Sequence, residues 1–474
     1  MEETLRRLRG FLGDRVRTDE ATRRAFAFDG MKIPGTCDAV VRVEAAEEVG
    51  TVLRLANEAG IPVTARATGS SLTGSAVPWK GGWVLDLSAL QECSIHPEER
   101  LARVGCGTKV GDLQSAAEAR GLFYPPDPSS KKYSTIGGNI ACNAGGMRCV
   151  KYGVTRDYVV SLQGYFASGE PFNFGREVKK YATGYNLRDL LIGSEGTLGV
   201  ITGASLRLIP KPDREHLVLA AFGSEALALR ACRQILEDGQ TPSIMEFLDV
   251  LSVGGAERTM GAPIFPEMPG RALLILQVDG DADAVEKQRR SLLKIIEAGA
   301  EAWREAAEVA EAEKFWEIRR ACSSSMFALG NTKLNNDVVV PLPAQEALLS
   351  AIDGMRQRTG MPIAVFGHAG DGNLHVNIMF NQEDPHHREH ARGVLGEVME
   401  TVIRLGGAIS GEHGIGLQKT PFLSSQLSAA ELEAMRAIKR ALDPKGILNP
   451  GKIFEPVETW NENRVLHRFE WDRH

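Results

Sequence analysis

Two histidines frame a short polar turn in the stretch Phe366–Asn377, whose sequence is Phe-Gly-His-Ala-Gly-Asp-Gly-Asn-Leu-His-Val-Asn. The glycines between His368 and His375 disfavour a helix, and apolar runs at 363–366 and 374–380 predict a strand on each side. Histidines at the two ends of such a turn can converge on one point, where a divalent metal ion would find two nitrogen ligands. The stretch therefore predicts part of a metal site.

A third ligand and a proton acceptor are expected from the short motif Gly411-Glu412-His413-Gly414. Glu412 would add an oxygen ligand, and two histidines with one carboxylate leave positions open for a substrate, as catalytic metal sites do. His413 would then handle a proton. A single buried histidine is more often a hydrogen-bonded core residue. Two histidines around Gly-Asp-Gly-Asn, together with a glycine-flanked Glu-His, are hard to explain by packing, and we interpret the group as functional.

The composition is that of an ordinary globular protein with more than one core. A length of 474 residues predicts two or three domains, of which we expect two to be large. Hydrophobic residues make up 43% and charged residues 24%. The net charge of -6 gives no indication of the basic surface that binds nucleic acid. The expected partners are therefore small molecules or proteins. The 50 glycines cluster in a few runs, which indicates loops where the backbone approaches a ligand.

The cysteines and the apolar runs indicate the compartment. The seven cysteines are scattered without any Cys-x-x-Cys spacing, which predicts a reducing environment. It also excludes an iron–sulfur cluster held within this chain, because such a cluster needs clustered thiolates. The N-terminal stretch is charged, and no apolar run reaches the roughly 18 residues of a membrane span. We expect a cytoplasmic protein, for which peripheral membrane attachment through a partner stays open.

Three segments rich in glycine and small polar residues occur in the first half of the chain. Arg66–Gly74 follows an expected strand and offers amides and hydroxyls suited to a diphosphate, although a flexible turn has the same composition. A run without expected regular structure extends from Tyr124 to Gly146, and a loop of that length is usually functional. Gly193–Thr202 leads into a strand, after which Pro210-Lys211-Pro212 marks the expected domain boundary.

Beyond this boundary the pattern predicts two ferredoxin-like halves that can share one sheet. The first has a strand at 217–222, a helix at 225–237, strands at 244–249 and 272–278, and a helix at 282–298. The second has a helix at 344–359, the two strands around the histidine turn, and a helix at 385–405. A further helix at 313–329 carries Arg319.

In this order, the three glycine-rich segments resemble the flavin domain of the vanillyl-alcohol oxidase superfamily. The histidine turn, Glu412-His413 and the ending Leu442–Lys452 narrow the resemblance to the FAD-linked D-2-hydroxy-acid dehydrogenases. That family includes the glycolate oxidase catalytic subunit, D-lactate dehydrogenase and D-2-hydroxyglutarate dehydrogenase. The resemblance implies an α+β fold, with a two-subdomain FAD-binding domain followed by a ferredoxin-like substrate and metal-binding cap. The implied divisions are an N-terminal helical segment at 1–35, the FAD-binding domain at 36–212, a cap at 213–454 whose C-terminal part returns to the flavin, and a tail at 455–474.

The resemblance also implies which residues surround a FAD held between the two subdomains. The first segment would wrap the pyrophosphate through Arg66, Ala67, Thr68, Gly69, Ser70, Ser71, Thr73 and Gly74. The isoalloxazine and ribityl chain would be lined by Pro126, Asp127, Thr135, Gly137, Gly138, Asn143, Gly145 and Gly146. The adenosine half would meet Glu195, Gly196 and Ile201, and Asn449 would reach the flavin from the C-terminal end. Relatives with covalent flavin carry a histidine where this chain has Ser70 and Ser71, so noncovalent FAD is implied.

The same resemblance implies that several polar residues of the cap bind the substrate. Arg319 would hold the substrate carboxylate in a two-pronged contact that lysine cannot match, although its sequence context also fits a surface arginine beside a glutamate. Lys333 and Asn335 lie where relatives place side-chain-selecting groups. Asn377, one strand period after His375, is expected to face the same site.

The implied reaction is oxidation of a small D-2-hydroxy acid to the 2-oxo acid. D-lactate and glycolate are the first candidates, with D-2-hydroxyglutarate as another. Zn is the favoured metal, with Mn and Fe as alternatives, and it would acidify the substrate hydroxyl while His413 takes the proton and hydride passes to flavin N5. The chain carries no nicotinamide, haem or cluster motif, so the electrons should leave to a quinone, an electron-transfer flavoprotein or a separate iron–sulfur subunit. A homodimer is compatible with the sequence.

Two other functional classes stay open on the sequence. A metal-dependent hydrolase would use the same ligands, with Glu412 or His413 activating water, but it leaves the segment Pro126–Gly146 without a purpose. A non-redox flavin protein is the other class. A relative of alkyl-dihydroxyacetone-phosphate synthase should carry a triple-histidine run, which is absent here, and an inactive flavin-binding subunit should lack His375 and Glu412-His413. A yellow protein with tightly held FAD would exclude the hydrolase.

Overall fold

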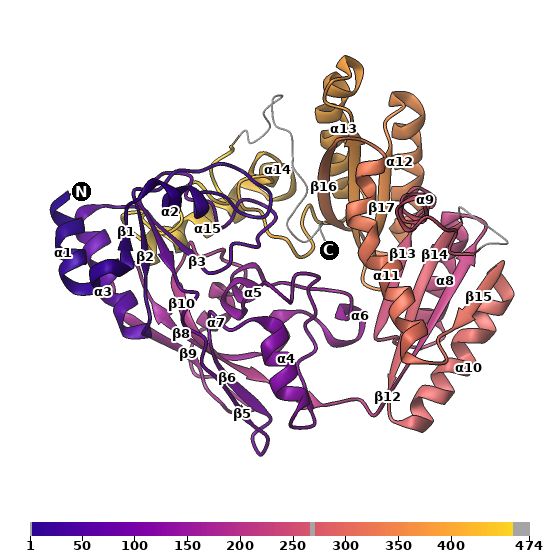
Figure 1. The fold of residues 1–474 in the computed structure, drawn as a ribbon, viewed down its shortest axis with the longest axis horizontal. Coiled ribbons are helices and arrows are strands. Elements are labelled where there is room, and N and C mark those ends of the chain that lie inside the picture. The colour runs from indigo at the N-terminus through magenta and orange to yellow at the C-terminus, as the bar shows by residue number, and fades with distance from the viewer. Residues whose placement is uncertain (1, 266–270, 458–474) are drawn as a thin grey trace. The chain divides into compact units, whose positions relative to one another are not determined.

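The chain divides into two compact units in a computed structural model that describes residues 2–265 and 271–457 (Figure 1). The first unit contains residues 2–145, 153–211 and 412–457, and the second contains residues 146–152 and 212–411. The main crossing point therefore falls at the expected boundary beside Pro212. Residues 412–454, which we expected within the cap, belong to the first unit by their contacts. Most of the expected tail, from residue 458 onward, lies outside the described residues.

The first sheet of the first unit leads directly into the first glycine-rich segment. Its strand order is β1 (Val16–Arg17), β2 (Ala39–Arg42), β4 (Trp83–Asp86) and β3 (Val63–Arg66). The helices beside it are α1 (Glu2–Leu12), α2 (Glu20–Ala25) and α3 (Ala46–Ala59). Helix α3 is amphipathic and buries Val49, Val52 and Leu53 in a shared core with Leu8 of α1. Strand β3 ends at Arg66, so the sheet holds the residue at which the first glycine-rich segment, Arg66–Gly74, begins.

A second sheet forms the other subdomain of this unit. Its order is β5 (Cys93–His96), β6 (Leu101–Gly105), β10 (Val200–Arg207), β8 (Val159–Tyr165) and β9 (Pro171–Gly175). Around it lie α4 (Val110–Glu118), α7 (Leu187–Leu191) and the short pair β7 (Leu122–Phe123) with β11 (Ile209–Pro210). The two separate sheets confirm the two-subdomain arrangement. The C-terminal residues add α14 (Thr420–Gln426) and α15 (Ala429–Leu442), and Leu448 then bridges to Val63 of β3.

The expectation of a long run without regular structure up to Gly146 is wrong in its second part. Residues Ile136–Cys142 form the helix α5, and Cys149–Tyr152 form the short helix α6. Glycine normally disfavours a helix interior. Here Gly137 is required by packing, because a Cβ at this position would lie 2.6 Å from the Cβ of Cys106. Tertiary contact has overridden local propensity.

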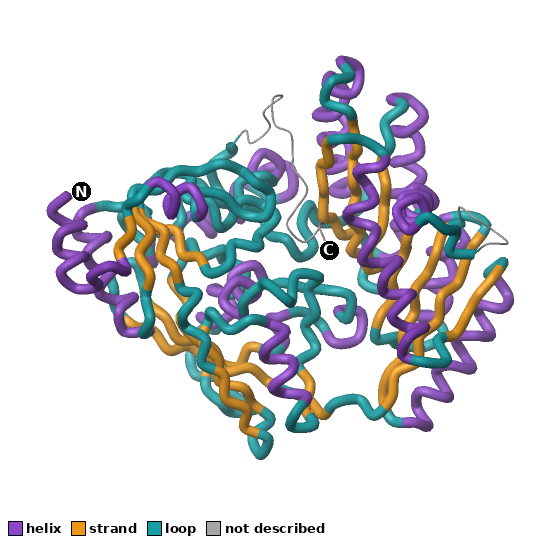
Figure 2. The backbone as a smooth tube through the Cα atoms, in the orientation of Figure 1, coloured by secondary structure: helices purple, strands orange, loops and turns teal. Residues whose placement is uncertain are grey.

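The second unit is built on one seven-stranded antiparallel sheet (Figure 2). Its order is β15 (Ala302–Glu305), β12 (Arg214–Phe222), β14 (Ala272–Gly280), β13 (Ile244–Leu248), β17 (Ile363–His368), β18 (Asn373–Phe380) and β16 (Thr332–Val339). The two predicted halves thus share one sheet, and β13 and β17 form the seam between them. Prediction and structure agree on this point.

Helices cover both faces of this sheet. One face carries α8 (Glu225–Glu237), α10 (Ala282–Gly299), α12 (Gln345–Thr359) and α13 (Pro385–Arg404). The other carries α9 (Val250–Met260), which we did not predict, and α11 (Val309–Ser325). Phe315 and Ile318 of α11 pack there against Phe366 and Ile275 of the sheet. Among the described helices, none combines the length and the apolar composition that a membrane span requires.

The turn between β17 and β18 depends on Gly372, and its substitution gives a first test. Gly372 has φ 86°, and an added Cβ would lie 2.1 Å from the carbonyl oxygen of Val340. Gly372→Ala should therefore lower the free energy of unfolding by about 2 kcal/mol or more, through backbone strain and displacement of the β16 end. Urea unfolding measures this. In Gly393→Ala, on α13, nothing lies within 4 Å of the new Cβ, and equal destabilisation by both changes would contradict the assignment.

Candidate functional site

Strand register gathers the predicted metal and substrate residues on one face of the sheet in the second unit. Directly opposed residues of antiparallel strands point to the same face. The opposed pairs run across four strands: Glu246 with His368, Phe366 with His375, His375 with Asp337, and Asn377 with Asn335. Phe366 packs against α11, so this is the face that α11 covers. The polar residues are thus held by strands, which fix side chains more firmly than loops do.

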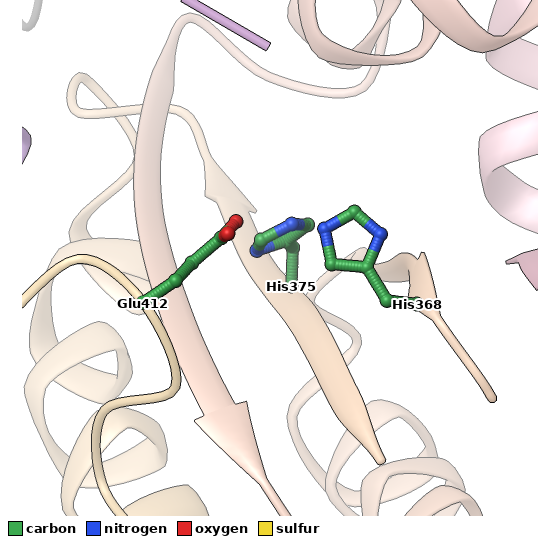
Figure 3. A group of neighbouring side chains, drawn as sticks. All are labelled: His368, His375 and Glu412. Carbon is green, nitrogen blue, oxygen red and sulfur yellow. The ribbon is translucent and has the colours of Figure 1, made fainter. Parts of the chain in front are cut away.

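The side chains of His368, His375 and Glu412 point toward one another (Figure 3). One ligand atom from each lies within 4.8 Å of the others, and the two imidazole rings are 5.3 Å apart between centroids and nearly perpendicular. Both histidines are buried and Glu412 is half-buried. The three residues that the sequence singled out as possible metal ligands thus lie close together. Two imidazole nitrogens with one carboxylate oxygen are a ligand set that fits a divalent metal with a position left for substrate.

A buried aspartate controls the approach of the chain to Glu412. Asp337, on β16 opposite His375, accepts hydrogen bonds from the amide of Gly411 at 2.9 Å and from the hydroxyl of Ser410 at 3.2 Å. Its other oxygen accepts a bond of 2.6 Å from the side chain of Asn373. Glu412 follows Gly411 directly, so the backbone just before the third possible ligand is held in place by Asp337.

His368 is held by a residue that sequence reasoning missed. Its Nδ1 is hydrogen-bonded to one carboxylate oxygen of Glu246, and the other oxygen accepts from Nε of Arg319. Burial opposes ionisation of Glu246, but the neighbouring His368 and Arg319 outweigh it and hold the pKa of this carboxyl well below its usual range. The available signal was a glutamate in the otherwise apolar strand Ile-Met-Glu-Phe-Leu, because a charge buried there needs partners.

The other predicted substrate residues lie on the same face or over it. Arg319 is 8% exposed and lies over the ring of Phe366, with 4.9 Å to the centroid, so the alternative of a surface arginine is wrong. Lys333 is buried, and its Nζ donates to the carbonyl and hydroxyl oxygens of Ser323. Among the described residues, the amide oxygens of Asn335 and Asn377 are buried and have no protein partner. Such atoms are suited to a polar ligand.

His413 belongs by its backbone to the first unit. Its carbonyl oxygen accepts a hydrogen bond of 3.2 Å from the hydroxyl of Thr73, in the first glycine-rich segment. The amide of Leu417 in turn donates to the carbonyl of Thr73 at 2.8 Å. The ring Nε2 of His413 lies 3.9 Å from a carboxylate oxygen of Glu412. The predicted base is therefore next to the predicted metal ligand and is held by the predicted cofactor loop.

The glycine-rich segments of the first unit come together as expected. The amides of Gly193 and Glu195 donate to the carbonyls of Ile140 and Ala141, which joins the third segment to α5. Ser75, just after the first segment, donates to the Glu195 carboxylate at 2.6 Å. In the described part of the chain, the buried polar atoms around these segments that have no hydrogen-bond partner include Ser134 Oγ, Asn139 Nδ2 and Asn449 Oδ1. Such hydrogen-bonding atoms fit a polar cofactor like FAD.

Two of the residues expected at the cofactor use their charged groups inside the protein. The Arg66 guanidinium donates to the carbonyl of Phe28 and lies over the ring of Phe26. The Glu195 carboxylate accepts from the amides of Ile415 and Gly416 at 2.7 and 2.8 Å. Burial raises the pKa of Glu195, although these hydrogen bonds oppose the shift. Both side chains thus shape the surrounding loops. Ile201, another expected contact, is a buried residue of β10.

Asn449 links these loops, and its substitution gives a second test. Its amide donates to the carbonyls of Ser75 and Glu195 at 2.8 and 2.7 Å, and it has φ 41°. Asn449→Gly keeps this backbone conformation but leaves two buried carbonyls unsatisfied. We expect the free energy of unfolding to fall by about 2–4 kcal/mol and FAD affinity to fall about 10-fold or more. Melting curves and flavin fluorescence titration measure the two effects, and the control is Asn331→Gly, which removes the hydrogen bonds of an asparagine at an exposed position.

Comparison with known proteins agrees with this geometry. Residues 37–175 match an FAD binding domain, and residues 211–453 match the C-terminal domain of FAD linked oxidases. The chain is 37% identical to glycolate oxidase subunit GlcD of Bacillus subtilis, over 88% of this chain and 89% of that protein. It is 34% identical to a D-lactate dehydrogenase of Anaerostipes hadrus, over 94% of each.

Solved structures show the same fold at low sequence identity. A p-cresol methylhydroxylase with bound substrate superimposes with a TM-score of 0.81 at 16% identity, over 96% of this chain and 97% of that one. An alkyldihydroxyacetonephosphate synthase gives 0.73 at 20% identity, over 95% and 86%. The fold is therefore of the vanillyl-alcohol oxidase type. With both of its domains matched and relatives aligned over nearly its whole length, the chain belongs to the family of FAD-linked oxidases and is an FAD-linked oxidoreductase.

Proposed function

We propose that this chain oxidises a small D-2-hydroxy acid, D-lactate or glycolate first, to the 2-oxo acid, with noncovalent FAD and one divalent metal. The single observation that carries this proposal is the convergence of His368, His375 and Glu412 beside His413 in an FAD-linked oxidoreductase. A hydroxyl next to a carboxylate is the substrate type that such an open metal site and a nearby base can activate together. The names of the two relatives, a glycolate oxidase subunit and a D-lactate dehydrogenase, support the same substrate class.

The cofactors would supply what the side chains cannot: FAD would accept a hydride, and a divalent metal held by His368, His375 and Glu412 would act as a Lewis acid. The chain orients the substrate. The Arg319 guanidinium pairs with the substrate carboxylate, and its own position is fixed by Glu246 and by the ring of Phe366. Asn377 and Asn335 offer buried amide groups to the hydroxyl and the α substituent. Lys333, on the same strand and face as Asn335, would add a second positive charge for the substrate.

His413 removes the hydroxyl proton in this mechanism. An imidazole ring nitrogen is the side-chain group most often used to take up a proton in catalysis. Glu412, 3.9 Å from the ring Nε2, stabilises the imidazolium that results. A positioned base of this kind contributes roughly 10²- to 10⁴-fold in rate.

The electrons then pass to an acceptor outside this chain, which we infer to be a quinone, an electron-transfer flavoprotein or an iron–sulfur subunit. The word subunit in the name of one relative supports a protein partner. The hydrolase alternative leaves the FAD binding domain unexplained, and we set it aside. The likeness to alkyldihydroxyacetonephosphate synthase is one of fold alone, at 20% identity.

Anaerobic reduction of the bound flavin tests the proposal. The purified protein, reconstituted with FAD and Zn, is mixed without oxygen with the D and L forms of lactate and 2-hydroxyglutarate and with glycolate. D-lactate or glycolate should bleach the flavin absorbance near 450 nm within seconds, and L-lactate should not. Bleaching by L-lactate alone, or by none of these acids, would overturn the proposal. Comparing rates between D-lactate, glycolate and D-2-hydroxyglutarate identifies the preferred substrate.

A further inference from the structure

We propose that Glu246 is a positioning residue that sets the tautomer of His368 and thereby makes this histidine a metal ligand. The inference rests on the proposed function, because it assigns a role within the same metal site. Glu246 is fully buried and His368 is 3% exposed, so no bulk water competes for the contact between them. The residues are directly opposed at the seam of β13 and β17, where the two halves of the sheet meet.

The chemistry follows from what each atom can donate or accept. A carboxylate is an acceptor only, so the Nδ1 atom of His368 that bonds to Glu246 must carry the ring proton. In neutral imidazole the proton sits on one nitrogen, and Nε2 then presents the lone pair that a metal needs. The same hydrogen bond also fixes the plane of the ring. Glu246 therefore decides both which nitrogen can bind the metal and where it points.

Arg319 makes this arrangement selective for glutamate. Its Nε donates to the second oxygen of Glu246, and a guanidinium has no acceptor. In Glu246→Gln the amide oxygen must therefore face Arg319, which turns the amide NH₂ toward Nδ1 of His368. Nδ1 then has to accept, the ring proton moves to Nε2, and the nitrogen meant for the metal is blocked. One buried carboxylate thus orients the metal ligand and the substrate-binding arginine together.

Asp249 offers a matched control in the same sheet. It directly follows β13, is also fully buried, and pairs with Arg356 and the amide of Val365. It is also the N-cap of α9 and accepts from the amide of Ser252. Asp249→Asn therefore removes a buried, arginine-paired carboxylate with no bond to either histidine. It should lower stability without changing metal affinity.

Metal titration of the full-length, FAD-containing protein tests the inference without an activity readout. Metal is removed with a chelator, and Co²⁺ is added while its visible d–d absorption is followed, with Zn²⁺ competition to obtain affinities. Glu246→Gln should weaken metal binding by about 10- to 100-fold, and Asp249→Asn should stay within about 2-fold of the unmodified protein. Glu246→Gln binding as tightly as the unmodified protein would overturn the inference while leaving the metal site intact. A failure of the unmodified protein to bind either metal would instead remove the metal from the proposed function, and the inference with it.

A spectroscopic measurement covers the case in which Glu246→Gln does not fold. Long-range ¹H–¹⁵N correlation spectra of the metal-free, unmodified protein, with His368 assigned by comparison with His368→Gln, report which ring nitrogen carries the proton. The Nδ1–H form is expected at His368, and Nε2–H would overturn the inference. Where Glu246→Gln does fold, the same spectrum should show the Nε2–H form, which a loss of stability alone would not produce.

Discussion

Flavin reduction by D-lactate or glycolate should slow by about 10²- to 10⁴-fold when His413 is replaced by alanine, while FAD stays bound. The imidazole is the proposed proton acceptor, and its Nε2 lies 3.9 Å from Glu412. The first glycine-rich segment bonds to the backbone of His413, through the Thr73 hydroxyl, and this contact does not depend on the ring. Anaerobic stopped-flow reduction measures the rate, and the flavin spectrum before mixing measures occupancy.

A histidine outside the site provides the control for this experiment. His390 lies in the first two turns of α13 and hydrogen-bonds to the carbonyl of His386. In His390→Ala, the substrate should therefore reduce the flavin as fast as in the unmodified protein. The rate of His413→Ala should also rise with pH, because hydroxide can then replace the missing base. Reduction of His413→Ala at the normal rate near neutral pH would refute the assignment of the base.

Loss of the metal should slow flavin reduction at least as much as loss of the His413 ring does. His375→Ala removes one of the three clustered ligands, and the rate of flavin reduction should fall by about 10³-fold or more, since Lewis-acid activation contributes several kcal/mol. Chelation of the unmodified protein should produce the same loss, and added Zn should restore activity to that protein but not to the variant. Metal analysis of both proteins, alongside the flavin spectrum, separates loss of metal from loss of FAD.

His216 supplies the corresponding control within the same sheet. It lies on β12, which β14 and β13 separate from β17, and its ring bonds to Glu305 at 2.7 Å. His216→Ala removes a strand histidine paired with a glutamate but leaves the three-residue group untouched. Metal content and flavin reduction should be unchanged. Full activity of the chelated, metal-free protein would contradict the role of the metal. FAD would then be the only cofactor that the reaction requires.

The histidine turn was predictable because all of its determinants are local. Glycines exclude a helix, apolar runs mark the two strands, and the spacing of His368 and His375 places both at the same end of a hairpin. Glu412 was predictable as a ligand by its type and its glycine neighbours. Its place beside the histidines depends on Asp337, which holds Gly411 from another strand. That contact cannot be read from a motif.

Glu246 escaped sequence reasoning because its partner is distant in the chain. It is separated from His368 by 122 residues, and only the pairing of β13 with β17 brings them together. Strand order is a property of the whole sheet, and nothing local to either strand encodes it. The helix α5 was missed for a related reason. Gly137 allows a close contact with Cys106, and helix propensities, which rate glycine as unfavourable, take no account of such a tertiary contact.

The point where the chain leaves the second unit limits how this protein can be recombined. Residues 212–411 carry both histidines and Arg319 but stop one residue short of Glu412, and the adjoining His413 is tied to Thr73. A chimera that exchanged only residues 212–411 with a relative would inherit ligands from two parents. Modular exchange of substrate preference therefore has to move the motif 411–414 together with the strands, or accept a mismatched coordination sphere.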